Sequence, residues 1–403
     1  MRSEPVSIKV RLKVKTPTAV GTGESYTLFG YAVKERELLV INFRKLIEKL
    51  KATGRLKEFK ELLKNFTPFD LVKLQRFYSQ VVGPEEAVAV LKLEPEVAEY
   101  FRGKFTKLTE LLKERNYKQY FEELGAAEVR EAFKNPLTGK AIIPGSSLKG
   151  AVRTSFLNYL IKEGKIDKER FVRELLEAFR EVGLQWPGVY SKEELSKVNF
   201  RTVEEKLKEI FNEIDSYLLC ELLAAVEASR FGRDLMRFVK VSDFSPVGEV
   251  STSVGRLRRV SRKGRENTFG FVEFVEPGAL FEGTITFYPE FIEKYAKCPL
   301  KVNSRLIVKA LRAEYSKVIR WERDFLGKAP LPFTKEEVEL YQKEDSPLAP
   351  VKLGFGAGAL SKTLSDAPEL RVIGNRRTGI RPEPTEISVM RGRPMGWCLV
   401  EVC

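Results

Sequence analysis

The order of extended and helical segments along the chain limits its fold more than any other feature of the sequence. Residues 6–15 (VSIKVRLKVK) alternate apolar and basic side chains, which is typical of a strand with one buried face. The segments that complete this pattern are a helix at 146–162, a strand at 238–242, a strand hairpin at 250–288, a helix at 301–325 and a strand at 396–402. This β-α-β-β-α-β succession is the order of a ferredoxin-like fold, so we expect an α+β protein.

Two long blocks interrupt this order in the chain of 403 residues. Apolar side chains three and four residues apart predict that residues 42–134 and 166–235 are large helical insertions. The rest of the chain would form the core. Its parts are 1–41 with the first core strand and a glycine loop, 135–165 with the first core helix, and 236–403 with the remaining strands, an Arg-rich hairpin, helices and a Gly-rich C-terminal loop.

Composition excludes several kinds of chemistry. The sequence contains no histidine, which rules out Ser–His–Asp triads, paired-imidazole RNA cleavage and His-ligated metals. The four cysteines contain no C-x-x-C pair and are too widely spaced for the disulfide framework of a secreted protein. Any chemistry would have to come from carboxylates with a hard metal ion, or from Lys, Tyr, Ser or Thr. We expect no resident metal and no other cofactor. A charged fraction of 31%, with few Cys and Met, fits the composition of proteins from thermophiles.

The charge balance raises the hypothesis of a polyanionic partner, although many basic proteins bind no nucleic acid and the location of the charge is more informative. The chain has 70 Lys and Arg against 56 Asp and Glu, a net charge of +14. No run approaches the roughly 18 apolar residues of a membrane span. The N-terminal sequence enters the strand pattern directly and lacks the features of a signal peptide. We expect a cytoplasmic protein without membrane contact.

The first candidate site is the segment PGSSLKGAVRT. A helix that begins at Ser146 or Ser147 directs free N–H groups and the positive end of its dipole outward, which suits a phosphate. Lys149 and Arg153, four residues apart, share one face above that end. Gly150 costs a helix roughly 1 kcal/mol, which is hard to explain unless another backbone approaches closely. An ordinary capped helix with two solvated cations is the alternative interpretation.

The second candidate site is the segment VGRLRRVSRKGREN (254–267), which carries six cations against the single Glu266. Because it joins two predicted strands, it would form a long hairpin with a cationic tip. Its arginines suit bidentate phosphate contacts and base stacking. A solvated tip without a partner is the alternative. The candidate contacts here are Arg256, Arg258, Arg259, Arg262 and Lys263.

The third candidate site is GFGAGALSKT (354–363), which superficially resembles a nucleotide-binding P-loop. Ser361 stands where that motif requires its second glycine, and no strand–loop–helix unit frames the segment. We therefore reject nucleotide binding. A glycine-rich loop that lets a phosphodiester backbone pass closely and a purely structural turn remain as interpretations.

Several segments together resemble motifs of the RAMP superfamily of CRISPR-associated RNA-binding proteins. The superfamily's diagnostic motif is similar to IPGSSLKGAVRT (143–154), and its first strand and glycine loop are similar to VKTPTAVGTGE (14–24). Its second core strand is similar to FVKVSD (238–243). The C-terminal signature of the fifth Csm subunit of type III-A CRISPR complexes resembles GFGAGALSKT together with PMGWCLVEV (394–402). The helical blocks match nothing.

The resemblance implies a modified ferredoxin-like (RRM-like) RAMP core in a non-catalytic RNA-binding subunit. Such a subunit caps the backbone filament of the Csm effector complex at the 3′ part of the CRISPR RNA (crRNA) and takes part in crRNA maturation and antiviral defence. The implied partners are crRNA, the neighbouring RAMP backbone subunit, other Csm subunits and recruited cellular nucleases. Matched by position, the RNA-binding residues are Gly21, Gly23, Gly145, Ser146, Ser147, Lys149, Gly150, Arg153, Gly354, Gly356, Gly358 and Lys362.

The competing functions are a metal-dependent RAMP endoribonuclease, another type III RAMP subunit and a scaffold that contacts only proteins. The related backbone subunit cuts RNA with an aspartate in a loop near its N-terminus, but here no Asp precedes Asp70 and the glycine loop offers only Glu24. Asp243 is a single acid, whereas a metal site normally needs at least two converging carboxylates. We interpret Asp243 as a cap or an ion-pair partner. The Arg-rich hairpin, assigned on charge alone, would contact RNA or the neighbouring subunit.

Overall fold

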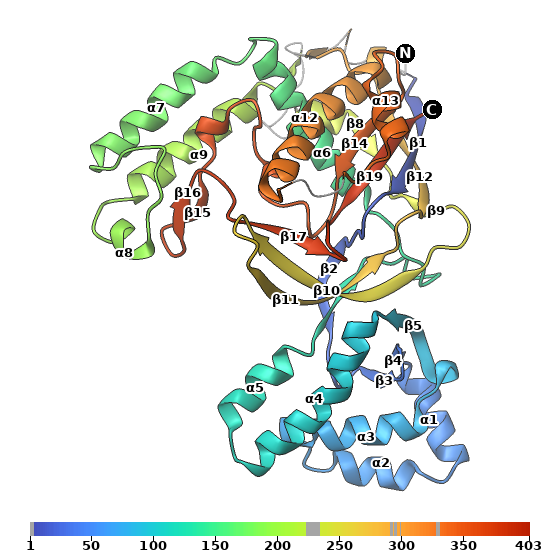
Figure 1. The fold of residues 1–403 in the computed structure, drawn as a ribbon. Coiled ribbons are helices and arrows are strands. Elements are labelled where there is room, and N and C mark those ends of the chain that lie inside the picture. The colour runs from blue at the N-terminus through green and yellow to red at the C-terminus, as the bar shows by residue number, and fades with distance from the viewer. Residues whose placement is uncertain (1–3, 223–233, 291–292, 294–295, 299, 328–330) are drawn as a thin grey trace.

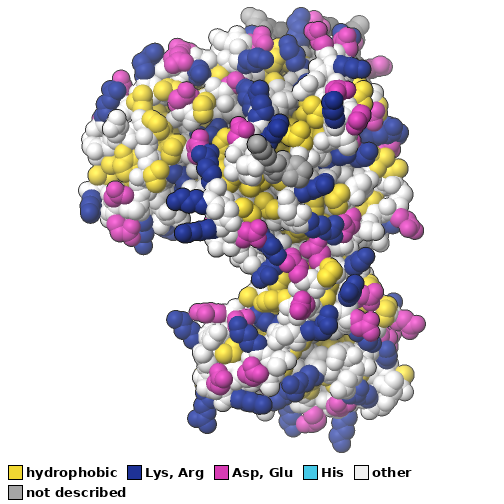
Figure 2. Space-filling view, in the orientation of Figure 1, with side chains coloured by type: hydrophobic (Ala, Val, Ile, Leu, Met, Phe, Trp, Pro, Cys, Tyr) yellow, Lys and Arg dark blue, Asp and Glu magenta, His cyan; other side chains and the backbone are white. Residues whose placement is uncertain are grey.

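The protein consists of a larger body, which holds both ends of the chain, and a smaller lobe joined to it by a narrow waist (Figure 1). The same waist is visible in the space-filling view, where basic and acidic side chains are interspersed over the face shown (Figure 2). The structure is a computed structural model. It describes residues 4–222, 234–290, 293, 296–298, 300–327 and 331–403.

The first sheet contains the predicted core strands. In spatial order these are β14 (Leu348–Lys352), β19 (Trp397–Val402), β1 (Val6–Val14), β12 (Leu280–Phe287) and β8 (Val239–Val241), with β9 (Ser245–Pro246) beside β12. Every neighbouring pair is antiparallel. The first and last core strands, β1 and β19, are neighbours at the centre of the sheet. The predicted ferredoxin-like order is confirmed for β1, β8, β12 and β19.

Two helices, α6 (Gly145–Lys162) and α12 (Ser304–Phe325), pack against each other and share one hydrophobic core with this sheet. The alternation predicted for the first strand is present, since Val10, Leu12 and Val14 are fully buried. The basic side chains of β1 are exposed or half-buried, and Lys9 and Arg11 both pair with a glutamate of β12. These charges are therefore paired on the accessible face of the sheet.

The second sheet joins the body to the small lobe. Its strands are β2 (Gly21–Tyr26), β6 (Val129–Ala132), β11 (Glu266–Val275), β10 (Thr252–Ser261), β5 (Ala87–Leu93), β4 (Glu37–Ile41) and β3 (Tyr31–Lys34), with β17 (Glu386–Met390) and β18 (Arg393–Pro394) attached to β10. The prediction that the whole 250–288 hairpin belongs to the core sheet was wrong. Only β12 pairs there, while β10 and β11 pair with each other in the second sheet.

The small lobe contains β3, β4 and β5 and five α-helices. One of its two hydrophobic cores lies within the lobe, and the other also includes Val254 of β10 and Phe271 of β11. The expectation that residues 42–134 are wholly helical was wrong, because β5 and β6 lie within them. β5 alternates exposed side chains (Val88, Val90 and Lys92) with half-buried or buried ones, and it pairs with β4 on one side and β10 on the other. The helices of the lobe are α1 (Phe43–Ala52), α2 (Leu56–Leu63), α3 (Leu71–Val81), α4 (Pro95–Lys113) and α5 (Tyr117–Gly125).

The second inserted block forms a helical arm on the body, visible to the left of α6 in Figure 1. Residues 223–233 of this block lie outside the described residues. The arm consists of α7 (Lys168–Glu181), α8 (Lys192–Leu195) and α9 (Arg201–Ser216), with the hairpin β15 (Ile373–Asn375) and β16 (Gly379–Arg381) at its end. A further helix, α13 (Lys335–Gln342), packs beside β14.

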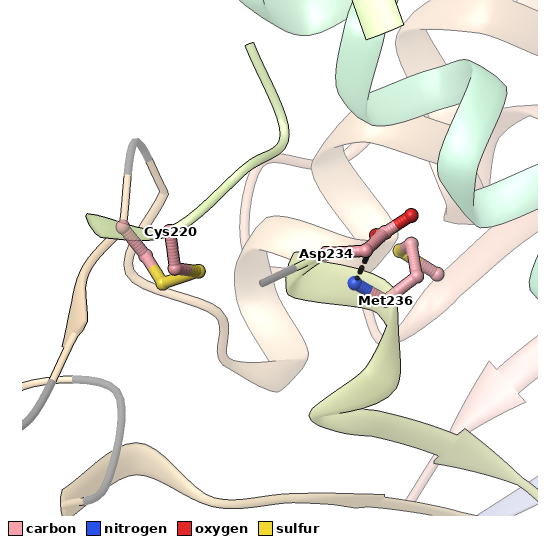
Figure 3. The surroundings of a disulfide bond; sticks show 4 residues. Cys220, Asp234 and Met236 are labelled. Atoms are coloured by element: carbon pink, nitrogen blue, oxygen red, sulfur yellow. Dashed lines mark hydrogen bonds between the residues drawn. A yellow bond between two sulfur atoms is a disulfide. The ribbon is translucent and has the colours of Figure 1, made fainter. Parts of the chain in front are cut away.

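Cys220 and Cys298 form a disulfide that the sequence did not predict. It joins the ends of two short paired strands, β7 (Glu221–Leu222) and β13 (Ala296–Lys297) (Figure 3). The two cysteines are 78 residues apart, so only the pairing of β7 with β13 brings them together. The other two, Cys398 and Cys403, are free thiols.

Candidate functional site

A cleft of about 810 Å³ lies where three segments from distant parts of the sequence meet. The glycine loop at the start of β2, the first turns of α6 and the loop that follows β14 all line it. The candidate residues brought together here are Gly21, Gly23, Ser147, Gly150, Gly354 and Lys362. Glu24, Glu128 and Glu131 line it too, so the cleft itself is not uniformly basic.

A second hollow of about 320 Å³ adjoins this cleft, because Gly150 lines both. Its other lining residues include Lys149, Arg153, Asp234 and Arg237. Outside the backbone of α6 itself, no atom of the described residues lies within 4 Å of the place where a Cβ would stand on Gly150, so the helix backbone is open to close approach there as far as these residues are concerned. Both hollows are lined by residues from the first turns of α6, and we refer to the two together as the depression.

The beginning of α6 is fixed by packing against β8. The helix begins at Gly145, one residue earlier than expected, and no serine side chain caps it. A Cβ on Gly145 would lie 2.4 Å from the carbonyl oxygens of Val241 and Ser242. The Gly145 N–H instead donates a hydrogen bond of 2.8 Å to Asp243 Oδ1. Gly145 is buried and serves packing, which corrects the expectation that it contacts RNA, and the interpretation of Asp243 as a helix cap is confirmed.

Lys149 provides a positive charge at the rim of the depression. In the part of the chain that the structure describes, its ammonium has no ion-pair partner. Partial burial lowers the pKa of Lys149 from its ordinary value. The negative charge of Asp234 acts against this shift, and the positive charges of Arg153, Arg237 and Lys240 add to it. Arg237 and Lys240 are exposed and were missed in the sequence. Ser146, one turn earlier on the helix, is exposed as well.

Arg153 does not offer a free cation, contrary to expectation. Its Nη2 lies 2.6 Å from Asp215 Oδ1, and its Nη1 lies 2.7 Å from Asp234 Oδ2. Burial alone would lower the pKa of Arg153, but the bonds and charges of the two aspartates raise it. Asp234 is oriented further by the Met236 N–H, which donates a 2.8 Å hydrogen bond to its Oδ1 (Figure 3). Arg153 therefore ties α6 to the end of α9 and to the segment before β8.

The two glycine-rich loops differ in how their glycines are used. Gly23 has a φ of +94° and open space around it, and Gly21 opens β2 beside it. Gly354 has a φ of +77°, and a Cβ there would lie 2.2 Å from the carbonyl oxygen of Ala19. The second loop is thereby held against the chain just before the first.

Other residues of the second loop divide in the same way. Gly356 is buried, and a Cβ there would lie 2.5 Å from Cβ of Met395, so its expected contact with RNA was wrong. Gly358, with a φ of +76°, and Lys362 are both exposed. Ser361 is buried and donates a hydrogen bond to the carbonyl of Ala357, which is a turn contact and not that of a P-loop.

The Arg-rich segment does form a hairpin, of β10 and β11, with the turn at residues 262–265. Arg258 was expected to be a free cation, but it pairs with Glu96 of α4 and with Glu266. Arg262 lies 3.4 Å from Glu383 in an exposed ion pair, and Lys263 is exposed at the tip.

Two further arginines of β10 lie on the sheet and not at the tip. Arg259 lies over the ring of Phe269, and Arg256 lines a third hollow of about 420 Å³. Arg130 of β6 lines both this hollow and the main cleft, so the two meet there. Arg130 was missed because it lies in a block predicted to be helical. Phe355 was missed because it is the apolar residue of a glycine-rich loop.

No three acidic or cysteine side chains of the described residues are grouped so that they could hold one metal ion. Within the same residues, no helix is long and apolar enough to cross a membrane.

A ferredoxin-like core with large insertions, in which the motif segments meet at one cleft, is the architecture expected of a RAMP protein. The family model described as RAMP superfamily matches residues 11–337, and the chain belongs to this superfamily. No curated protein matches the sequence.

Two solved structures show the same fold. One is a chain of the cryo-EM structure of a Csm-crRNA-target RNA ternary complex in a type III-A CRISPR-Cas system, with a TM-score of 0.61, 20% identity and coverage of 99% of this chain and 100% of that one. The other is the crystal structure of T. onnurineus Csm5, with a TM-score of 0.55, 20% identity and coverage of 97% and 99%.

Proposed function

We propose that this chain is a non-catalytic RNA-binding subunit of a type III-A CRISPR (Csm) effector complex. In this role it caps the backbone filament at the 3′ part of the crRNA and takes part in crRNA maturation. Support comes from membership of the RAMP superfamily and from full-length similarity to a chain of a Csm-crRNA-target RNA complex and to a Csm5. The partners in this proposal are crRNA and the neighbouring Csm subunits.

The observation that carries the proposal is the convergence of three distant motif segments on one cleft. The open backbone at Gly150 and Gly23 allows a sugar–phosphate chain to approach closely. Lys149 lies beside it without an ion-pair partner among the described residues, together with the exposed cations Arg237 and Lys240. Unpaired cations along a groove are the usual basis of phosphate contacts, which position a strand without identifying its bases.

A binding function is favoured over cleavage by the role of Asp243. Its carboxylate accepts the hydrogen bond from the first N–H of α6 and is thus part of the helix cap. The acid proposed for a nuclease would need a second converging carboxylate and a metal ion.

Salt dependence of RNA binding tests the proposal. The affinity of the purified protein for a fluorescent single-stranded RNA should fall with salt, and Lys149→Ala should reduce the log–log slope by about 0.7, the value for one phosphate contact on a single strand. Lys51→Ala is the matched control, because Lys51 is an exposed lysine of α1 in the small lobe. The control slope should equal that of the unmodified protein.

An unchanged slope for Lys149→Ala would contradict the placement of the site, and absence of RNA binding would contradict the function. Cleavage of labelled RNA with Mg²⁺ or Mn²⁺ that disappears in Asp243→Asn would contradict the non-catalytic role. The role in maturation predicts that complexes assembled without this chain carry crRNA with altered 3′ ends, which sequencing of the bound RNA measures.

A further inference from the structure

Two phenylalanines and two arginines from separate parts of the chain form one stacked cluster beside the cleft. The rings of Phe269 in β11 and Phe355 in the loop after β14 have centroids 5.7 Å apart and an interplanar angle of 35°. The guanidinium carbon of Arg130 lies 4.4 Å from both centroids, and that of Arg259 lies 3.9 Å from the centroid of Phe269. We refer to these four residues as the stacking platform.

The charge of the platform is left uncompensated. Among the described residues, neither Arg130 nor Arg259 has a carboxylate partner, and both lie close to the same ring. Burial lowers the pKa of Arg130 from its ordinary value, and the charge of Arg259 lowers it further. Two like charges held this close raise the free energy of the unliganded protein, so the arrangement favours an anion that lies between or beside them.

A neighbouring residue on the same strand shows that the fold can neutralise an arginine where it needs to. Among the residues that the structure describes, Arg258 has two glutamate partners and Arg256 has none, and Arg256 Nε is buried there without a hydrogen-bond partner. Arg256 lines the hollow that also contains Phe269 and Arg130. A buried N–H donor without an acceptor carries a free-energy cost, and Arg256 is, like Arg259, an arginine of β10 without a carboxylate partner among the described residues.

The position of the platform connects two hollows. Phe355, with 37% of its surface exposed, lines the main cleft together with the two glycine loops. Phe269 lines the hollow that also contains Arg256, and Arg130 lines both. A strand that runs along the cleft over Gly150 therefore has the exposed ring of Phe355 beside it and guanidinium groups immediately beyond.

We propose that the platform is a nucleobase-stacking site, in which an unpaired base of the RNA strand stacks on Phe355 while its flanking phosphates contact Arg130, Arg259 and Arg256. Aromatic rings stack every base through its π-face, so the site holds the strand without identifying its sequence. Arginine suits this site because its planar guanidinium group stacks on aromatic rings and can also donate two hydrogen bonds to the oxygens of one phosphate. The inference rests on the proposed RNA-binding function and adds the position and the chemistry of a second contact.

A comparison of two strands tests the platform. Phe355→Leu keeps an apolar side chain but removes the π-face, and its affinity for an oligouridylate should fall about 5- to 150-fold, as for the loss of one stacked base. For a strand of the same length made of base-free ribose phosphates, the affinity of Phe355→Leu should equal the affinity of the unmodified protein. The salt slope should be unchanged, whereas Arg259→Gln should reduce it by about 0.7.

Phe211→Leu is the matched control, because Phe211 is an equally exposed phenylalanine on α9, with 41% of its surface accessible. Thermal melting of each variant verifies folding. If Phe355→Leu binds oligouridylate as tightly as the unmodified protein does, the stacking site is overturned but the proposed function is not. The same holds if Phe355→Leu loses the same affinity for oligouridylate and for the base-free strand. Loss of binding to a neighbouring Csm subunit with RNA affinity intact also overturns it, and identifies a protein contact. Absence of RNA binding by the unmodified protein overturns the proposed function as well.

Discussion

Two glycines five residues apart on α6 should respond oppositely to alanine, and Gly145 gives the larger effect. A Cβ at Gly145 would lie 2.4 Å from two carbonyl oxygens next to β8, a separation that real Cβ atoms essentially never show. The helix must move away from β8, which costs about 1–3 kcal/mol as for other overpacked sites. The same movement weakens the Gly145 N–H bond to Asp243, and bonds to charged groups contribute about 1.5–3 kcal/mol.

These two costs arise from one displacement and overlap, so we expect Gly145→Ala to reduce the free energy of unfolding by about 2–4 kcal/mol. Gly150→Ala is the control, because its Cβ would meet no atom of the described residues within 4 Å apart from the backbone of its own helix. Alanine there should stabilise the helix by up to about 1 kcal/mol. The same substitution should weaken RNA binding if a strand passes over that backbone.

Urea denaturation followed by circular dichroism measures both effects as shifts of the unfolding midpoint. The midpoint of Gly145→Ala should lie below, and that of Gly150→Ala at or above, the midpoint of the unmodified protein. A Gly145→Ala variant as stable as the unmodified protein would refute the packing argument, and with it the assignment of this motif glycine to structure.

Two more substitutions separate stability from binding. Arg153→Ala leaves Asp215 and Asp234 without their cation, so it should lower the free energy of unfolding by about 1–3 kcal/mol in urea denaturation. The log–log salt slope of RNA binding should be unchanged. A reduced slope would contradict the structural role of Arg153. Burial raises the pKa of Glu314 to about 7 from 4.5, so the folded state binds more protons than the unfolded state between these values. The free energy of unfolding should therefore fall as the pH rises from 4.5 to about 7. In Glu314→Gln this fall should be about 3 kcal/mol smaller at pH 8. Urea denaturation of both proteins at pH 5 and pH 8 measures the difference. Equal pH profiles would contradict the burial argument.

The core of the fold was predictable because its elements carry local patterns. The alternation of β1 follows from its one buried face and is observed. The apolar residues spaced four apart in α6 are buried as expected, in a helix that is buried on several sides. The partner of a strand is not a local property. β10 and β11 have the alternation and the turn of a hairpin, but nothing in their sequence indicates that they pair in the second sheet and not with β12.

The small lobe shows another limit. β5 has the sequence AVAVLKL, a short apolar run that fits a strand or a buried helix equally well. Its pairing with β4 and β10 decides between them, and these partners lie about 50 residues before it and more than 150 after it along the chain. Tertiary contacts override local preference in such runs.

The candidate site was predictable as a set of segments but not residue by residue. The motif indicates that glycines matter at 145 and 150, yet only the structure distinguishes the one that packs on β8 from the one that is open. Arg153 looks like Lys149 in the sequence, because the aspartates that neutralise it are 62 and 81 residues away. Nothing in the sequence distinguishes Arg130 or Phe355, because they belong to a candidate site only where the fold brings them together.

Cross-linking of RNA to the protein tests the central claim most directly, namely that the strand lies in the cleft formed by the three segments. A single-stranded RNA with photoreactive uridines is irradiated in the complex, and the modified peptides are identified by mass spectrometry. We predict cross-links within residues 19–25, 146–154 and 352–362, which line the cleft. Cross-links confined to the helices of the small lobe or to α7 and α9 would contradict the account.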